Sequence, residues 1–153
     1  MNLPSTSKAQ LLVQCFAFVN ERIDSAKQAM NAAQDSANQE EKSSAGDKYE
    51  TGRAMAQIER DKAAQQVVEA MKMQAVLSKI NADLHHSKIG LGSLVITDTH
   101  RFYLSVSAGK LSVNGLDFLA ISTQSPIGQL LLPKSLGDSF VFNNQKQTIR
   151  EVH

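Results

Sequence analysis

The stretch that decides the fold is Leu12–Ala37, LVQCFAFVNERIDSAKQAMNAAQDSA, in which apolar residues or alanines recur alternately four and three positions apart. This interval keeps the recurring side chains on one face of a helix and is typical of a coiled-coil seam. No proline or glycine interrupts the stretch. We therefore predict a helix from about Ser7 to about Glu41, capped by Ser5, Thr6 or Ser7. The predicted seam is Leu12, Phe16, Val19, Ile23, Ala26, Met30, Ala33 and Ala37.

A second helix is predicted from about Asp47 to about Asp83, after a turn of small and polar residues at 42–46. Its composition is dominated by Ala, Glu, Lys, Gln and Met, which are good helix formers. Two long helices joined by so short a turn must run antiparallel, so residues 1–84 are predicted to form a coiled-coil hairpin. The apolar stripe of this second helix is predicted to be Ile58, Val67, Ala70, Met73, Leu77, Ile80 and Leu84.

Beyond a short polar connector that contains His85 and His86, the pattern changes from helical spacing to alternation. Phe102, Leu104 and Val106 alternate with Tyr103, Ser105 and Ser107, as in a half-buried strand. Asn114-Gly115 is a strong hairpin signal, and Asn143-Asn144 indicates a second hairpin. Ser125-Pro126 opens a short helix, because proline is favoured in a first helical turn. The fold class is therefore α+β, with a small antiparallel sheet domain and one short helix at 85–153.

Composition excludes several classes of function. The net charge of the 153 residues is +1, so nothing points to independent DNA binding. The single cysteine, Cys15, rules out a disulfide framework within the chain and fits a reducing compartment. Cys15 is flanked by apolar residues and is predicted to be a buried small hydrophobe. The apolar run 11–19 is too short to span a bilayer, so we expect no membrane contact and a cytoplasmic protein.

The predicted turn between the two helices concentrates acidic residues, namely Glu40, Glu41, Asp47 and Glu50. Asp47 and Glu50 lie three positions apart, so on a helix their carboxylates share a face. Carboxylate oxygens are the ligands that Mg²⁺ prefers. The same spacing also suits a helix cap, with Asp47 as N-cap and Glu50 reaching back. Spacing leaves both interpretations open, and a cap residue can also be a ligand.

Two segments resemble the GreA/GreB family of bacterial transcript-cleavage factors. The segment ISTQSPIG at 121–128, followed by Gly137-Asp138, resembles the family's I-S-x-x-S-P-[IL]-[AG] … G-D pattern. At the turn, Gly46-Asp47-Lys48-Tyr49-Glu50 resembles the family's G-D-x-x-E. The order of a helical hairpin and a small β-rich domain is also similar, and the resemblance implies that residues 85–153 have an FKBP-like fold.

The resemblance implies a specific function. Gre factors insert their hairpin into the secondary channel of RNA polymerase, close to the RNA 3′ end, where acids at the tip help to hold Mg²⁺. The polymerase then cleaves its own backtracked transcript, so the factor is not an enzyme alone. By this likeness Asp47 and Glu50 are the catalytic acids and share the metal with the polymerase. Ser125, Pro126 and Ile127 are the candidate polymerase contact.

Other functions stay open. The family usually has asparagine after the second acid, whereas Thr51 follows Glu50 here, and Lys48 and Arg53 bring positive charge that competes with Mg²⁺. These departures favour a channel-binding regulator that does not promote cleavage. A peptidyl-prolyl isomerase, implied by the FKBP likeness, lacks support from aromatic residues, since the chain has no tryptophan and two tyrosines. A plain coiled-coil interaction module, in which the acids only cap a helix, is the fourth alternative.

Overall fold

The computed structural model describes the backbone of residues 3–41 and 46–153 and the side chains of residues 7–39 and 51–153. The chain forms two compact units. One contains Met1–Phe18 together with Ala75–His153, and the other is Val19–Gln74. The predicted boundary lies after residue 84, whereas this division groups the first turns of the N-terminal helix with the sheet.

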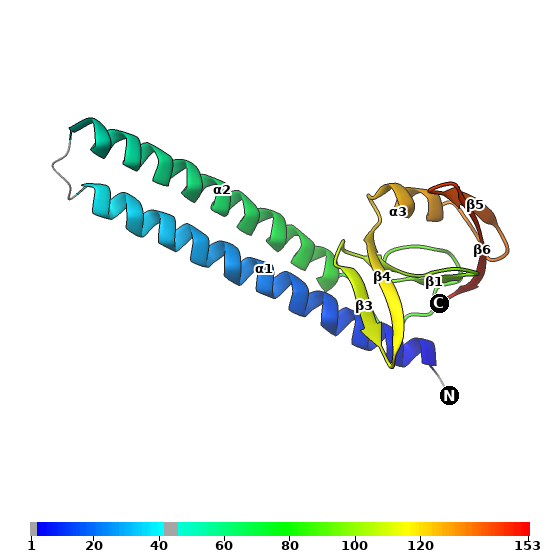
Figure 1. The fold of residues 1–153 in the computed structure, drawn as a ribbon. Helices are drawn as coiled ribbons and strands as arrows, with labels where there is room; N and C mark the ends of the chain where they lie inside the picture. Colours follow the sequence, from blue (N-terminus) through cyan, green and yellow to red (C-terminus); the bar gives the residue numbers. More distant parts are fainter. Residues whose placement is uncertain (1–2, 42–45) are drawn as a thin grey trace. The chain divides into compact units, whose positions relative to one another are not determined.

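Two long helices, α1 (Leu3–Glu41) and α2 (Gly46–Ser78), run side by side in opposite directions (Figure 1). Within Val19–Gln74 the direction is fixed by contacts between the beginning of one helix and the end of the other. The Gln74 side-chain amide donates to Asn20 Oδ1 at 3.0 Å, and Arg22 Nη1 lies 3.9 Å from Met73 Sδ. The predicted antiparallel pair of helices is therefore present.

Small residues form most of the interface between the two helices. Val19, Ile23, Ala26, Ala33 and Ala37 of the predicted α1 seam are buried, as expected, and Met30 is half-buried. On α2 the buried positions recur every seven residues, at Ala56, Ala63, Ala70 and Leu77. An alanine stripe on each helix lets two backbones approach closely, because no long side chain stands between them.

The predicted stripes are wrong in two places. Ile58 is 64% exposed, because the seam of α2 follows the alanines instead of the largest side chains, and Leu84 is 53% exposed in the linker, because α2 ends at Ser78 and not near Asp83 as predicted. Near the start of α1, Leu11 and Cys15 are fully buried while Leu12 and Phe16 are half-buried. The buried face of α1 therefore shifts by one residue in the turns that belong to the sheet unit.

The sheet has six strands in the order β3-β4-β2-β1-β6-β5. Their bounds are β1 Leu94–Thr97, β2 Arg101–Ser105, β3 Gly109–Val113, β4 Leu116–Ser122, β5 Ser139–Phe142 and β6 Gln145–Val152. All neighbouring pairs are antiparallel except β2 and β4, which run parallel. The prediction of a purely antiparallel sheet is thus wrong, and the sheet is mixed.

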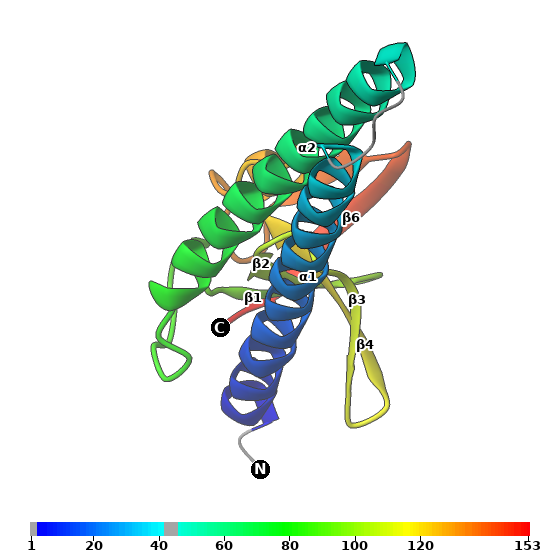
Figure 2. The same ribbon diagram turned by 90° about the vertical axis from the view of Figure 1, so that its left-hand side faces the viewer.

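The parallel pair arises because β4, and not β3, lies beside β2. β4 carries the buried Phe118, Ala120 and Ile121, whereas β3 is mostly exposed and includes Lys110 and Ser112. A polar strand is better placed at the edge of a sheet, where a charged side chain discourages pairing with other chains. The hairpin of β3 and β4 therefore lies with its polar arm outermost (Figure 2).

Both predicted hairpin turns are present. Asn114 and Gly115 have φ of 53° and 78°, and Asn143 and Asn144 have φ of 52° and 61°. Positive φ at both central residues is the type I′ geometry that matches the twist of two-residue hairpins. Asparagine tolerates this region better than most residues, so the sequence signal and the backbone agree.

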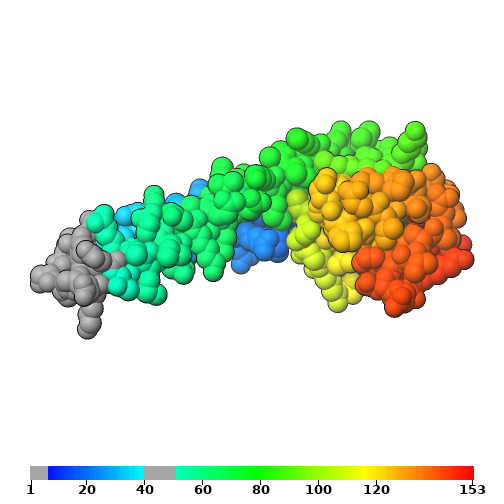
Figure 3. All heavy atoms as spheres, turned by 90° about the horizontal axis from the view of Figure 1, so that it is seen from above, coloured from blue at the N-terminus to red at the C-terminus, as the bar shows by residue number. Residues whose placement is uncertain are grey.

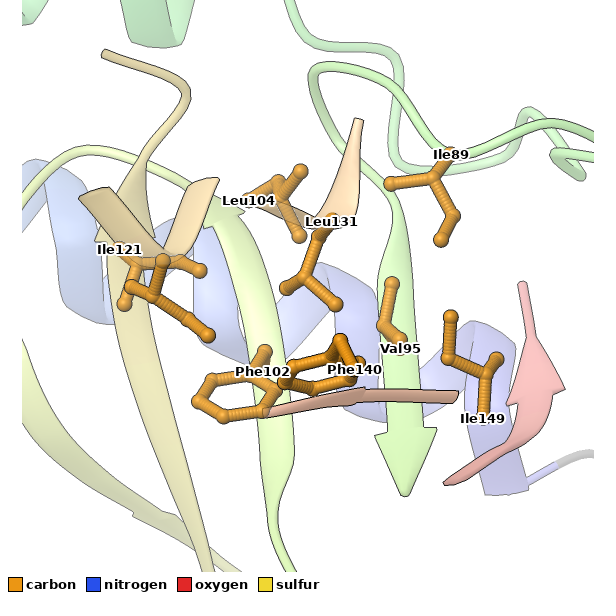
Figure 4. Packing of buried hydrophobic residues seen from close by; sticks show 9 residues of the cluster. Ile89, Val95, Phe102, Leu104, Ile121, Leu131, Phe140 and Ile149 are labelled. Atoms are coloured by element: carbon orange, nitrogen blue, oxygen red, sulfur yellow. The ribbon is translucent and has the colours of Figure 1, made fainter. Parts of the chain in front are cut away.

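One face of the sheet carries the main hydrophobic core (Figure 4). The short helix α3 (Pro126–Leu131) packs on this face through Ile127 and Leu131. Side chains from the central strands and from β5 complete the cluster, which comprises Ile89, Val95, Phe102, Leu104, Ile121, Ile127, Leu131, Phe140 and Ile149.

The opposite face of the central strand β2 is also buried. Tyr103 is 0% exposed and Ser105 is 2% exposed, although alternation predicted a solvated face for them. The first turns of α1 account for this burial: Cys15 Sγ lies 3.5 Å from Ser105 Oγ, and Gln14 Nε2 donates to the Ser112 carbonyl at 2.9 Å. The sheet is thus covered on both faces, by α3 and by the first turns of α1.

Candidate functional site

The predicted metal-binding acids lie where the second helix begins. α1 ends at Glu41 and α2 begins at Gly46, so the backbone of Asp47 and Glu50 belongs to the first turn of α2. The helix begins one residue earlier than the sequence predicted. The side chains of residues 40–50 lie outside the described residues, so the choice between a cap and a metal ligand stays a prediction.

The residues that follow the acids are described. Thr51 is exposed, Gly52 is half-buried and Arg53 is exposed. Gly52 is thus partly covered one turn before Ala56, the first buried alanine of α2. The side chain of Arg53 is therefore exposed at a position close in sequence to the acids. The alternative function, a channel-binding regulator that does not promote cleavage, requires such a charge.

The predicted polymerase contact is a tightly built corner between β4 and α3. Ser125 caps α3: its Oγ accepts from the Gly128 N–H at 3.1 Å and donates to the Ser122 carbonyl at 2.6 Å. Pro126 occupies the first turn, as predicted, and its side chain is exposed. Ile127 is 6% exposed and belongs to the core. Of the three predicted contact residues, Pro126 offers the most surface to a partner.

Gly128 explains why this corner needs its particular sequence. A Cβ atom at this position would overlap the carbonyl oxygen of Ser122 and would lie 3.0 Å from Thr123 Cα. The helix therefore rests directly on the backbone at the end of β4. Figure 3 shows this region (yellow to orange) at the surface of the sheet domain, next to the last strands (red). The side chains of Gln124 and Gln129 are exposed on either side of Pro126.

Cys15 is the only candidate nucleophile that the sequence singled out, and it is inert. Its side chain is 0% exposed, and burial raises the pKa of its thiol, with a smaller opposing effect from its hydrogen bond to Ser105. The prediction of a buried small hydrophobe is confirmed. Beside it, the Tyr103 hydroxyl is buried without a hydrogen-bond partner among the described residues. Burial, and then the charge of Cys15, raise the pKa of Tyr103 far above its usual range.

The described side chains, 7–39 and 51–153, contain no group of three or more His, Cys, Asp or Glu arranged to hold a metal ion. The acids at 40–50 are not among them. Within the part of the chain that the structure describes, no helix has both the length and the apolar character that crossing a membrane requires.

The chain was also compared with known proteins. No protein-family model matches it, and no curated protein matches it. The likeness to Gre factors therefore depends on the segments 46–50 and 121–138 and on the order of a helical pair and a sheet domain.

Proposed function

We propose that the protein is a transcription elongation factor of the GreA/GreB type. It binds RNA polymerase through the secondary channel and promotes Mg²⁺-dependent cleavage of backtracked transcripts. The observation that carries the proposal is the position of Asp47 and Glu50, in the first turn of α2 directly after the connection between two antiparallel helices. The proposal also assigns the protein to the cytoplasm.

The donor set suits the proposed metal. Two carboxylates three positions apart on a helix share a face, and Mg²⁺ binds hard oxygen ligands. Mg²⁺ takes about six ligands, so two carboxylates fit a site that a partner completes better than a site that stands alone. When held there, Mg²⁺ would polarise a phosphate and activate water. The part of Asp47 and Glu50 is to supply ligand oxygens and negative charge.

The helical pair suits a narrow channel. Its fully buried positions over 26–37 and 56–70 are all alanines, and small interface residues keep helix axes close. A helical pair with alanines at its interface is thinner than one with leucines there. This shape is favourable for entering a confined space.

In the same proposal the sheet domain is FKBP-like and docks at the rim of the channel. The surface that supports this assignment is the exposed Pro126 at the start of α3, flanked by Gln124 and Gln129. Ser125 and Ile127 support that surface: Ser125 caps α3, and Ile127 packs into the core.

The test is a cleavage assay on backtracked complexes of the polymerase from the same organism, with Mg²⁺ present. We expect RNA 3′ fragments to be released when the protein is added. The Asp47→Asn/Glu50→Gln variant should promote cleavage at least about 100-fold more slowly, because losing even the residues that only support a metal ligand lowers activity by up to about 100-fold. The matched control is Glu59→Gln, which neutralises an exposed carboxylate of the same helix. If the double variant cleaves as fast as Glu59→Gln, the metal role is wrong.

A second candidate function is a channel-binding regulator without cleavage, favoured by Thr51 and by the exposed Arg53 beside the acids. It predicts that the protein copurifies with polymerase and changes pausing while no fragment appears. A pull-down that recovers no polymerase subunit would contradict both candidates and leave the coiled-coil interaction module.

A further inference from the structure

A buried lysine joins the first turns of α1 to the linker that follows α2. Lys8 is 2% exposed, and its ammonium donates to the Leu84 carbonyl at 2.7 Å. Among the described residues no carboxylate forms an ion pair with it. A buried ammonium without a counter-ion is costly, so a further positive charge nearby is strongly disfavoured.

The same linker carries a histidine two positions after the carbonyl that this lysine binds. His86, two residues after Leu84, is half-buried against Gly92, where its Nε2 lies 3.5 Å from the position that a Cβ would occupy. Gly92 is held in turn, because its N–H donates to the Leu104 carbonyl at 2.7 Å. His86 therefore packs against the fixed loop that leads into β1.

The other titratable groups around His86 are also mainly basic. His85 precedes it, and the His85 ring meets the His153 ring edge-on with centroids 6.0 Å apart. The acid that contacts His153 is Glu151, whose Oε1 lies 3.2 Å from His153 Nε2. Asp83 and Lys88, on the same linker, are exposed to solvent. Protonation of His86 would thus add a positive charge that both Lys8 and His85 disfavour.

Electrostatics agree with this geometry. Burial, then the charge of Lys8 and then that of His85 lower the pKa of His86 below its ordinary value of 6.5. Burial also lowers the pKa of Lys8. The folded state therefore disfavours the protonated form of His86 that an unfolded chain would hold at mildly acidic pH.

We propose that Lys8, the Leu84 carbonyl and His86 form a proton-sensitive clasp, which holds the first turns of α1 on the linker 79–93 when His86 is neutral and loosens when His86 gains a proton. The clasp acts on the segment through which α2 leads into β1. It is independent of the proposed function, because it involves neither the acids at 47 and 50 nor the Pro126 surface.

The sign of the effect follows from proton counting. Between the folded pKa of His86 and 6.5, the unfolded state binds more protons than the folded state, so the free energy of unfolding rises with pH. The contribution is complete above 6.5 and is lost as the pH falls through this window. Loosening should appear first as lower protection against hydrogen exchange, relative to the intrinsic rate, at the amides of the linker and of the first turns of α1.

The decisive experiment is an NMR titration of the histidine imidazoles in the full chain, in wild type and in Lys8→Met. We expect His86 to titrate below 6.5 in wild type and to move upward by at least about half a pKa unit when the lysine charge is removed. His100, in the β1–β2 turn, is the internal control and should not move. A wild-type His86 that titrates at or above 6.5, or one unaffected by Lys8→Met, would overturn the proposal.

A second measurement covers the case in which Lys8→Met does not fold. The His86→Gln variant keeps Lys8, and hydrogen exchange is followed from pH 7.5 to 5. In wild type, exchange of the linker amides should slow less than the intrinsic, base-catalysed chemistry predicts as the pH falls, and His86→Gln should abolish this excess. The matched variant His100→Gln should retain it, and equal behaviour of the two variants would contradict the clasp.

Discussion

The helical pair and the sheet domain are stabilised by opposite kinds of packing. Over residues 26–70 the buried apolar positions are alanines, whereas the sheet buries Phe102, Tyr103, Leu104 and Leu131 almost completely. Alanines bury little area each, so the pair gains from close backbone approach and from good helix formers. The sheet domain gains from large side chains that fill its core. The same substitution should therefore have very different effects in the two regions.

The largest effect is expected where the core is filled by a large side chain. Leu131→Ala removes a fully buried leucine between α3 and the sheet, which should lower the free energy of unfolding by about 3–5 kcal/mol through lost burial and a residual cavity. Chemical denaturation followed by circular dichroism measures the loss. The exposed Leu136→Ala is the control and should change stability by less than about 0.5 kcal/mol. Equal losses would mean that α3 does not seal the core.

An effect of intermediate size is expected in the helical pair, where a larger side chain, instead of a smaller one, should lower the free energy of unfolding. Ala63→Leu places a large side chain in the alanine seam, and overpacking should cost about 1–3 kcal/mol by forcing the helices apart. Ile58→Leu, at an exposed position of the same helix, is the control, with a change near zero. Thermal unfolding monitored at 222 nm compares them. A stabilised Ala63→Leu variant would show that the helices are not in close contact there.

The smallest effect is expected at the face of the sheet that the first turns of α1 cover. Tyr103→Phe removes a buried hydroxyl that has no hydrogen-bond partner among the described residues, so its loss should be neutral or should stabilise by up to about 1 kcal/mol. The readout is the denaturation midpoint, with Tyr103→Leu as the control that also removes ring volume. A loss above about 1 kcal/mol for Tyr103→Phe would reveal that the hydroxyl is hydrogen-bonded in solution.

The sequence predicted those elements whose signals are local. The seam of α1 from Val19 onward, the two hairpin turns at 114–115 and 143–144, and the Ser125 cap all depend on residues close in the chain. On α2 the predicted positions Ala70 and Leu77 are buried, whereas Ile58 is exposed because the close approach of α1 selects the alanines at 56 and 63.

Features that depend on distant segments were not predicted. The parallel pairing of β2 with β4 depends on which arm of the 109–122 hairpin lies outermost, and the burial of Tyr103 and Ser105 depends on cover by the first turns of α1. The burial of Lys8 was missed for the same reason, because its hydrogen-bond partner Leu84 is 76 positions away. For the candidate site, the sequence indicated Asp47 and Glu50 from their spacing, and the backbone places both in the first turn of α2.

The union of residues 1–18 with residues 75–153 in one compact unit has a consequence for biosynthesis. Leu11 and Cys15 leave the ribosome long before the sheet of the same unit, which includes the Cys15 contact Ser105 in β2, has been translated. Until then a growing chain can pair its two helices but must leave these side chains in water. Contacts of such long sequence separation form slowly, so we expect completion of the sheet to limit the folding rate and nascent chains to be vulnerable to aggregation at this segment.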